Sequence, residues 1–365
     1  MTGRFLVLIL VLQAEAASSG GGNQERTLSI ETSIPAADAR VAGGLLFVLE
    51  PDYLHVAAYD ARTPGSKGPR WRTRFQETAA GVHSLHFALD RVFVYAGNRL
   101  VALDAGSGKI AAAREVPYHE SPRNRSGCTF DVRFGACALV CQCRMQFLSC
   151  RDGAPIGPEY RASEICFSPD FEGDEGGCSC GSGVWPLGHA GDLLLASIED
   201  AAQKEPGAWH GPRAVVAVDR RSGREVYRAA AAGVSSWYRE GFGVSPDGEV
   251  CWIRGGKGDG LKIFSCRTGA LLARRTDCGE HTSSPDAPPP AGETEAPSAR
   301  RAGKTLEAAA GRGELVIRAL PSGREVVRLE GVFSILALEG PLGEGKLILY
   351  RHAEAGPGEV WLLSR

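Results

Sequence analysis

The most regular pattern in the chain is a series of short strand-like segments, in which apolar residues either alternate with polar ones or follow one another. Residues 84–89, 91–95, 99–103 and 109–116 each have this pattern, and short polar or glycine-containing turns separate them. Four strands that follow one another through tight turns form an antiparallel meander. The segment from 84 to 116 therefore predicts one four-stranded antiparallel sheet.

The turn before the fourth strand of this meander recurs along the chain. Ala102–Gly108 reads ALDAGSG and Ala217–Gly223 reads AVDRRSG, so Asp104 and Asp219 hold equivalent positions. An Asp side chain can bond the backbone N–H groups of its own turn, and glycine accepts the left-handed conformation that closes it. Glycines that end such turns lie at Gly108, Gly153, Gly223, Gly269 and Gly323. Their spacings of 45, 70, 46 and 54 residues predict a repeat of about 45 residues with insertions.

The two ends of the chain each carry part of one repeat. The last repeat has strand patterns at 347–350 and 359–363 but no fourth strand, whereas 27–34 (TLSIETSI) alternates like a strand before the first repeat. If the N-terminal strand completes the last sheet, the chain closes on itself and leaves no unpaired sheet edge there. We therefore predict an all-β fold, a seven-bladed β-propeller of four-stranded antiparallel blades closed by the N-terminal strand. Two packed β-sandwich domains are the alternative.

The repeat also resembles a known family. The pattern strand–Ala-x-Asp-x-x-Ser/Thr-Gly–strand is similar to the repeat of pyrroloquinoline-quinone-like (quinoprotein dehydrogenase-like) β-propellers, in a degenerate form. Ser245–Gly248 (SPDG) also resembles a hairpin turn of bacterial propellers. This resemblance implies a propeller over nearly the whole chain, but one fold carries many functions. The family has a docking Trp four residues after the turn glycine, where this chain has Ala112, Tyr227, Ala273 and Val327.

The N-terminus has the organisation of a secretory signal. Residues 5–12 (FLVLILVL) are continuously apolar, and Ala14-Glu15-Ala16 has the form that signal peptidases cleave. Eight apolar residues are too few to span a bilayer. We predict a signal peptide at 1–16, a flexible linker at 17–26 and the propeller at 27–365, with a buried first strand as the alternative for the apolar run. The protein is then expected in the periplasm or outside the cell, without a membrane span.

Two segments interrupt the repeat. The residues of 279–304 are rich in Pro, Ala, Ser and Glu, a composition that cannot build a packed core. The residues of 161–190 contain three cysteines and form a second insertion. Long loops on a rigid scaffold often carry function, although simple decoration is the alternative here.

Eleven cysteines fit an oxidising compartment. Cys251 and Cys266 flank a hairpin whose turn is predicted at Lys257–Gly260, so they are expected to be directly opposed and disulfide-bonded. Cys143 and Cys150 form a second, weaker candidate pair. Buried thiols that act as small hydrophobic groups are the alternative for both pairs.

Charge and motifs exclude several function classes. The chain has 41 basic and 43 acidic residues, which argues against nucleic-acid binding by counterion release. A metal site made of Cys166, Cys178, Cys180 and His189 is conceivable, but disulfides suit an exported chain better. The acidic run 170–176 lacks the spacing of a calcium loop. We therefore expect no metal, no cofactor and no catalytic residue.

These observations favour an exported, monomeric, non-catalytic propeller that binds a protein or a small ligand. A quinone-dependent dehydrogenase-like enzyme is one alternative, although the family's enzymes have adjacent cysteines that this chain lacks. A disulfide-linked structural surface protein is the other. The sequence assigns neither the ligand nor the binding face.

Overall fold

A computed structural model of the chain describes fifteen segments, which are separated by gaps. The described residues are 28–64, 68–75, 83–96, 99–115, 129–133, 136–141, 144–161, 184–199, 213–230, 242–245, 247–254, 261–275, 300–311, 313–353 and 356–365. Within them the regular structure is β-strand, together with one 3-10 turn at Gly340–Leu342. The predicted signal peptide and linker lie outside the described residues.

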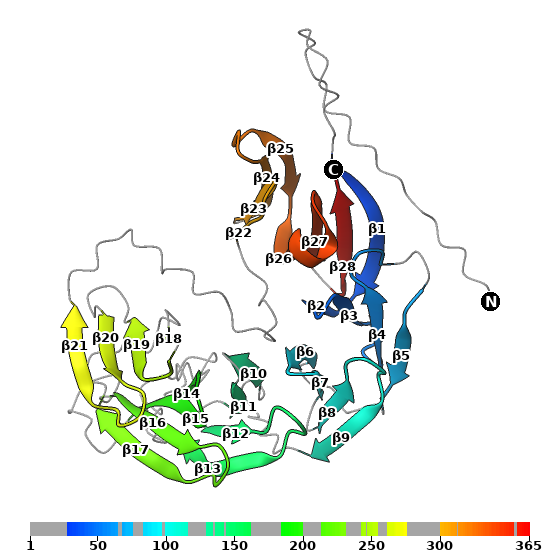
Figure 1. The fold of residues 1–365 in the computed structure, drawn as a ribbon. Helices are drawn as coiled ribbons and strands as arrows, with labels where there is room; N and C mark the ends of the chain where they lie inside the picture. The colour runs from blue at the N-terminus through cyan, green and yellow to red at the C-terminus, as the bar shows by residue number, and fades with distance from the viewer. Residues whose placement is uncertain are drawn as a thin grey trace, which may run out of the picture. The chain divides into compact units, whose positions relative to one another are not determined.

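The strands form seven four-stranded antiparallel sheets, which we call blades 1 to 7 (Figure 1). Blade 1 contains β2 (Asp38–Ala42), β3 (Leu45–Leu49), β4 (His55–Asp60) and β5 (Trp71–Arg74). Blade 2 contains β6 (His83–Ala88), β7 (Arg91–Ala96), β8 (Arg99–Asp104) and β9 (Ile110–Glu115). Blade 3 contains β10 (Thr129–Arg133), β11 (Ala136–Cys141), β12 (Arg144–Leu148) and β13 (Pro155–Arg161). Blade 4 contains β14 (Val184–Ala190), β15 (Leu193–Glu199), β16 (Arg213–Asp219) and β17 (Glu225–Ala230).

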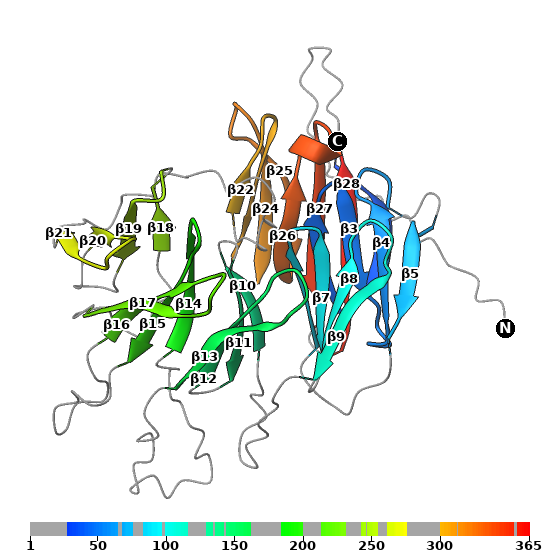
Figure 2. The same ribbon diagram turned by 60° about the horizontal axis from the view of Figure 1, so that its bottom comes forward.

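The remaining blades follow the same plan. Blade 5 contains β18 (Phe242–Val244), β19 (Val250–Arg254), β20 (Leu261–Ser265) and β21 (Leu271–Arg275). Blade 6 contains β22 (Arg300–Ala302), β23 (Leu306–Ala310), β24 (Glu314–Ala319) and β25 (Glu325–Glu330). Blade 7 contains β26 (Val332–Leu338), β27 (Lys346–His352), β28 (Gly358–Ser364) and β1 (Ser29–Ala36). Figure 2 shows such a meander, β14 to β17, from a second direction.

The N-terminal strand completes the last blade. β1 pairs antiparallel with β28, from Ser29 opposite Ser364 to Ala36 opposite Gly358. Six of the seven sheets follow chain order, and only this one joins the two ends of the described chain. The predicted fold class, a seven-bladed β-propeller whose N-terminal strand completes the last blade, is therefore confirmed.

Burial along each blade follows from its position between neighbours. The second strands are covered on both faces and are almost continuously apolar, as in β3 (LLFVL), where four of five residues are buried. The outer strands are half-covered and alternate, as in β9 (IAAARE), which has no fully buried residue. The amino-acid pattern thus determines which strand lies inside each blade.

The blades fall into two compact units, and the core of each lies between adjacent blades. One unit is built from the described residues within 1–77 and 294–365, which form blades 1, 6 and 7. Leu46 and Val48 of blade 1 pack there against Ile348 and Leu362 of blade 7. The other unit is built from the described residues within 78–293, which form blades 2 to 5. Its apolar clusters join blade 2 to 3, blade 3 to 4 and blade 4 to 5.

The repeated turn joins the third and fourth strands of five blades. The N–H of Gly108 donates to the Asp104 carbonyl at 2.8 Å, and Asp104 Oδ1 accepts from the N–H and the hydroxyl of Ser107 at 2.9 and 2.7 Å. Asp219 makes the same bonds to Ser222. The closing glycines Gly108, Gly153, Gly223, Gly269 and Gly323 have φ between 68° and 71°. This left-handed conformation explains why glycine recurs at this position.

Both predicted insertions overlap real strands. β14 (Val184–Ala190) lies within 161–190 and supplies the first strand of blade 4, and β22 (Arg300–Ala302) lies within 279–304 and begins blade 6. Pro186 and Gly188 in the interior of β14 interrupt the residue pattern typical of a strand. The register in which β14 pairs with β15 shifts between these two residues. β22 is three residues long and mostly charged. Residues 162–183 and 276–299 lie outside the described residues.

Candidate functional site

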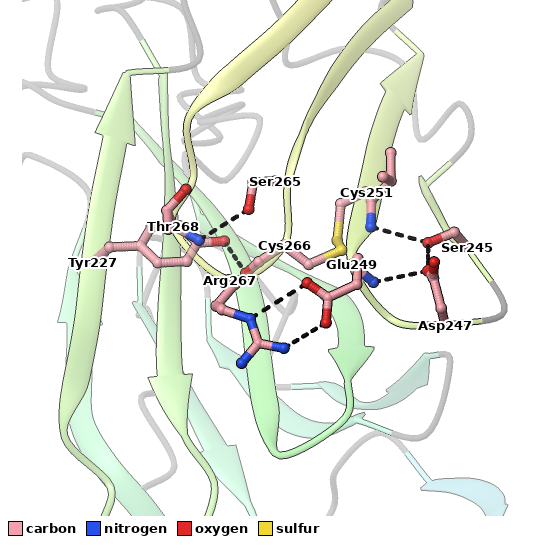
Figure 3. Close-up of a disulfide and its surroundings, with 10 residues drawn as sticks. Tyr227, Ser245, Asp247, Glu249, Cys251, Ser265, Cys266, Arg267 and Thr268 are labelled. Atoms are coloured by element: carbon pink, nitrogen blue, oxygen red, sulfur yellow. Dashed lines mark hydrogen bonds and ion pairs between the residues drawn. A yellow bond between two sulfur atoms is a disulfide. The ribbon is translucent and has the colours of Figure 1, made fainter.

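Two disulfides lie among the described residues of the second unit. Cys251 and Cys266 are bonded, with a Cα–Cα distance of 5.1 Å, as predicted (Figure 3). Cys150 is bonded to Cys137, with a Cα–Cα distance of 5.4 Å, so its predicted pairing with Cys143 is wrong. β11 and β12 pair up to Cys141 opposite Arg144. The hairpin is therefore centred before Cys143, which lies outside the described residues, and Cys137 is the cysteine of β11 that approaches Cys150.

Both disulfides connect equivalent positions of their blades. Cys251 is opposite Phe264 and not Cys266, so the bonded cysteines are diagonal neighbours and not directly opposed as expected. Cys137 is likewise opposite Leu148, two residues before Cys150. In both blades the second cysteine lies three residues before the turn glycine, and all four cysteines are at most 2% exposed. Each disulfide thus ties the second strand of a blade to its repeated turn.

A polar cluster in the first unit is the candidate site. It lies where blade 7 meets blade 1, and we call it the blade 7–1 cluster: Asp38, Arg40, Ser334, Tyr350 and His352. Ser334 Oγ and His352 Nε2 are 2.8 Å apart. The rings of Tyr350 and His352 meet edge to face, with centroids 4.7 Å apart.

The sheet register places these side chains together. Ser334 is opposite Tyr350, and Val332 is opposite His352, so these residues share one face of β26 and β27. The Tyr350 hydroxyl donates to the carbonyl of Ala37 at 2.9 Å, which anchors the ring to the start of blade 1. Tyr350 is buried, whereas His352 is exposed. The imidazole of His352 is therefore accessible to solvent, while the Tyr350 ring that it contacts is held in place.

The electrostatics of the cluster favour a neutral imidazole. The partial burial of the His352 imidazole lowers its pKa, the charge of Asp38 opposes this effect, and that of Arg40 adds to it. Asp38 Oδ1 accepts from Arg40 Nη1 at 2.6 Å and from the N–H of Ala39 at 2.8 Å. A neutral imidazole both donates and accepts hydrogen bonds, so near pH 7 the cluster offers a hydroxyl, an imidazole and a paired guanidinium.

The Ser334–His352 contact also has the geometry of a nucleophile and its base. Acyl transfer further requires a group that orients the imidazole and donors for the oxyanion. Tyr350 packs against the imidazole through a ring edge, and the carboxylate of Asp38 is engaged by Arg40. These contacts suit hydrogen-bonded recognition of a ligand.

A second polar group lies on the loop before β4 and on the first residue of that strand. Potential ligand atoms of Glu50, Asp52 and His55 are within 4.8 Å of one another. Both oxygens of Glu50 accept from Arg72 at 2.7 Å, and Asp52 Oδ2 is 2.6 Å from His55 Nδ1. Burial raises the pKa of Asp52, but hydrogen bonds from Leu54 and His55 outweigh this effect and lower it. These partners compete with a cation, so we read the group as an ion-pair network that shapes the loop.

The sequence disfavours a metal site made of cysteines and His189, and of the residues of that site the structure describes only His189. His189 lies on β14, and burial lowers the pKa of its imidazole. Cys166, Cys178 and Cys180 lie outside the described residues, so this alternative stays open.

No protein-family model and no curated protein matches the chain. Among solved structures, it is similar to BamB from Moraxella catarrhalis, with 14% identity, coverage of 92% of this chain and 99% of that one, and a TM-score of 0.33. It is also similar to the Cps50 (Swd1) β-propeller domain of Myceliophteria thermophila, with 15% identity, 91% and 98% coverage, and a TM-score of 0.42. A europium-containing methanol dehydrogenase has 11% identity, 93% coverage of both chains and a TM-score of 0.43.

BamB and the methanol dehydrogenase are propellers of the pyrroloquinoline-quinone type, whose repeat the sequence resembles. At these identities and TM-scores the similarities say nothing about function. The assignment of the fold rests on the sheet order of this chain. No helix among the described residues has the length and hydropathy to cross a membrane.

Proposed function

We propose that this protein is an exported, non-catalytic β-propeller that binds a protein or a small ligand through the blade 7–1 cluster. One observation carries the proposal: the Ser334–His352 pair is held on Tyr350, which is itself bonded to blade 1. Rigid strands already hold these side chains in place. A ligand that forms hydrogen bonds with them therefore costs the protein little further conformational entropy.

Export is supported by the cysteines and by the N-terminus. Two buried disulfides suit an oxidising compartment, and the A-x-A sequence at Ala14–Ala16 suits cleavage by a signal peptidase. Expression of the full chain with a C-terminal tag in a Gram-negative host should give a shortened periplasmic protein whose N-terminus follows Ala16. Retention of the full-length chain in the cytoplasm would refute export.

Binding is tested by affinity capture from an envelope extract and by thermal shift with a panel of small hydroxyl- and carboxyl-bearing compounds. The double variant Ser334→Ala, His352→Ala should lose the captured protein or the thermal shift. Ser322→Ala is the matched control, because Ser322 lies in the repeated turn of blade 6. Equal binding by both variants would show that the ligand does not use the blade 7–1 cluster.

Acyl transfer by Ser334 is the second candidate, because its Oγ lies 2.8 Å from an imidazole nitrogen. Hydrolysis of p-nitrophenyl acetate and labelling by a fluorophosphonate probe test this directly. If the protein is non-catalytic, its rate of ester hydrolysis and its labelling by the probe will not exceed those of the Ser334→Ala variant. Labelling of Ser334 would replace the binding role by a hydrolytic one. Stoichiometric uptake of pyrroloquinoline quinone with calcium would instead favour the dehydrogenase-like alternative.

A further inference from the structure

We propose that the two disulfides position the turns on which the preceding blades dock, so that reduction of a disulfide releases the contact between those two blades. The contact between β17 of blade 4 and the turn Ser265–Gly269 of blade 5 is called the blade 4–5 seam. It is the contact drawn in Figure 3.

A side-chain hydrogen bond links the two blades at this seam. The Tyr227 hydroxyl on β17 donates to the backbone carbonyl of Cys266 at 2.8 Å. Tyr227 lies on the fourth strand of blade 4, four residues after the turn glycine Gly223. The tyrosine thus adds a hydrogen bond to the packing of its ring against the turn of blade 5.

The residue that accepts this bond is held on two sides. Cys266 is joined by its sulfur to Cys251 on β19, and its N–H donates to the carbonyl of Glu249 at 2.9 Å. The Arg267–Glu249 ion pair connects the same turn to the residue just before β19, but both side chains are exposed. Exposed ion pairs contribute little, so the covalent bond is the stronger constraint on the carbonyl.

The fit at the seam is tight. A Cβ atom built on Gly269 would lie 2.5 Å from Cε2 of Tyr227 and 2.6 Å from Cβ of Ala229. A hydrogen bond needs its acceptor within a few tenths of an ångström of the ideal place. A small displacement of the turn would therefore break the Tyr227 bond.

The blade 2–3 contact repeats this arrangement. Arg114 on β9 donates from Nε to the carbonyl of Asp152 at 3.0 Å and from Nη2 to its carboxylate at 3.1 Å. Asp152 lies two residues after Cys150, which is bonded to Cys137. A Cβ atom on Gly153 would lie 2.8 Å from Cδ2 of Leu100 in blade 2. Here too, a disulfide-bonded turn accepts a polar side chain of the preceding blade.

The blade 3–4 contact shows what happens without a disulfide. Leu194 and Arg220 stand at the positions that correspond to Cys251 and Cys266. A Cβ atom on Gly223 would lie 2.7 Å from the backbone N of Gly157, so the two glycine backbones touch directly. At the turn glycine the blades thus meet through their backbones, whereas the two disulfide-bonded turns accept hydrogen bonds from side chains. The disulfides thus occur on the turns that accept side-chain hydrogen bonds from the preceding blade.

Because the disulfides are buried, their reduction is coupled to separation of the turn from the preceding blade. A dithiol such as dithiothreitol converts each disulfide into two thiols and is itself oxidised to a cyclic disulfide, with transfer of two electrons and two protons. The four cysteines are at most 2% exposed, so the attacking thiolate reaches sulfur only when the turn has moved away from the preceding blade. Docking therefore protects the disulfide, and the disulfide maintains docking.

Hydrogen exchange of the full chain, read by mass spectrometry, tests the proposal. Tyr227→Phe should raise exchange in β17 and in Ser265–Gly269 about fivefold, the effect of one lost hydrogen bond. In the background of Cys251→Ala, Cys266→Ala the same change should raise exchange less than about twofold, because the acceptor is already displaced. An equal effect of Tyr227→Phe in both backgrounds would overturn the proposal.

A second measurement covers the case in which the double-alanine variant does not fold. The wild-type protein is treated with dithiothreitol under native conditions, and exchange is followed at the 4–5 seam and at the blade 3–4 contact around Gly157 and Gly223. Loss of protection at the seam, with unchanged protection at the 3–4 contact, supports positioning by the disulfide. Uniform loss over the whole chain would show that the disulfides stabilise the fold without directing docking.

Discussion

The carboxylate of Glu339 in blade 7 accepts hydrogen bonds from both the backbone N–H and the hydroxyl of Thr305 in blade 6. The N–H groups of Lys304 and Gly345 donate to the same carboxylate. Glu339 is 2% exposed, so this carboxylate joins the β22–β23 turn to the β26–β27 turn without direct hydration. Adjacent blades of the first unit are thus also joined by side-chain hydrogen bonds, as they are in the second unit, and here a charged carboxylate accepts them.

Glu339→Gln should destabilise the protein by about 2 kcal/mol. Each oxygen of the carboxylate accepts at least two donors, and glutamine replaces one oxygen with an amide that donates. At least one backbone N–H then faces another donor. Urea unfolding followed by circular dichroism measures the loss. The exposed neighbour Glu344 provides the control, and Glu344→Gln should be neutral.

Acid should weaken the same contact. Burial raises the pKa of Glu339, but its hydrogen bonds from Thr305, Gly345 and Lys304 outweigh burial and lower the pKa below the ordinary value of 4.5. A carboxyl group with a lowered folded-state pKa contributes stability that is present above its unfolded-state pKa and is lost as the pH falls through the folded-state pKa. The melting temperature should therefore decline below about pH 4.5. Glu339→Gln should show a smaller decline between pH 5 and pH 3, and equal declines would contradict this role.

Most of the fold could be predicted from the sequence because its signals are local. The turn motif at Asp104–Gly108 indicates a backbone conformation that only a few residues allow, and its recurrence in five blades gives the length of the repeat. The strand β14 (Val184–Ala190) escaped prediction because Pro186 and Gly188 interrupt its alternation. Its membership in the sheet is decided by the neighbouring strand β15 and not by its own propensity.

The candidate site could not be predicted, because it depends on register and on distant parts of the chain. Ser334 and His352 meet only through the pairing of β26 with β27, which shifts between Ile335 and Ala337. Asp38 lies about three hundred residues earlier and comes close because β1 pairs with β28. The disulfides show the same limit. Cys251 and Cys266 could be paired from the hairpin, whereas the partner of Cys150 depends on where the turn between β11 and β12 lies.

Removal of β1 tests the completion of blade 7. Deletion of residues 29–36 should lower the denaturation midpoint and expose the edge of β28, whose unpaired backbone groups then favour association between chains. Size-exclusion chromatography and urea unfolding measure the two effects. Deletion of residues 17–26, the predicted linker, is the control and should change neither. A β1-deleted protein that stays monomeric with an unchanged midpoint would contradict the role of β1.

The turn glycines allow backbone strain to be separated from packing between blades. Gly269 and Gly323 have nearly the same φ, 71° and 68°. A Cβ atom on Gly323 meets nothing within 4 Å, whereas on Gly269 it would overlap Tyr227. Gly323→Ala should cost about 1 kcal/mol for the left-handed conformation alone. Gly269→Ala should cost about 1–3 kcal/mol more, because the blade 4–5 seam must open to admit the methyl group. Urea unfolding of both variants measures the difference, and equal losses would show that Tyr227 does not pack on this turn.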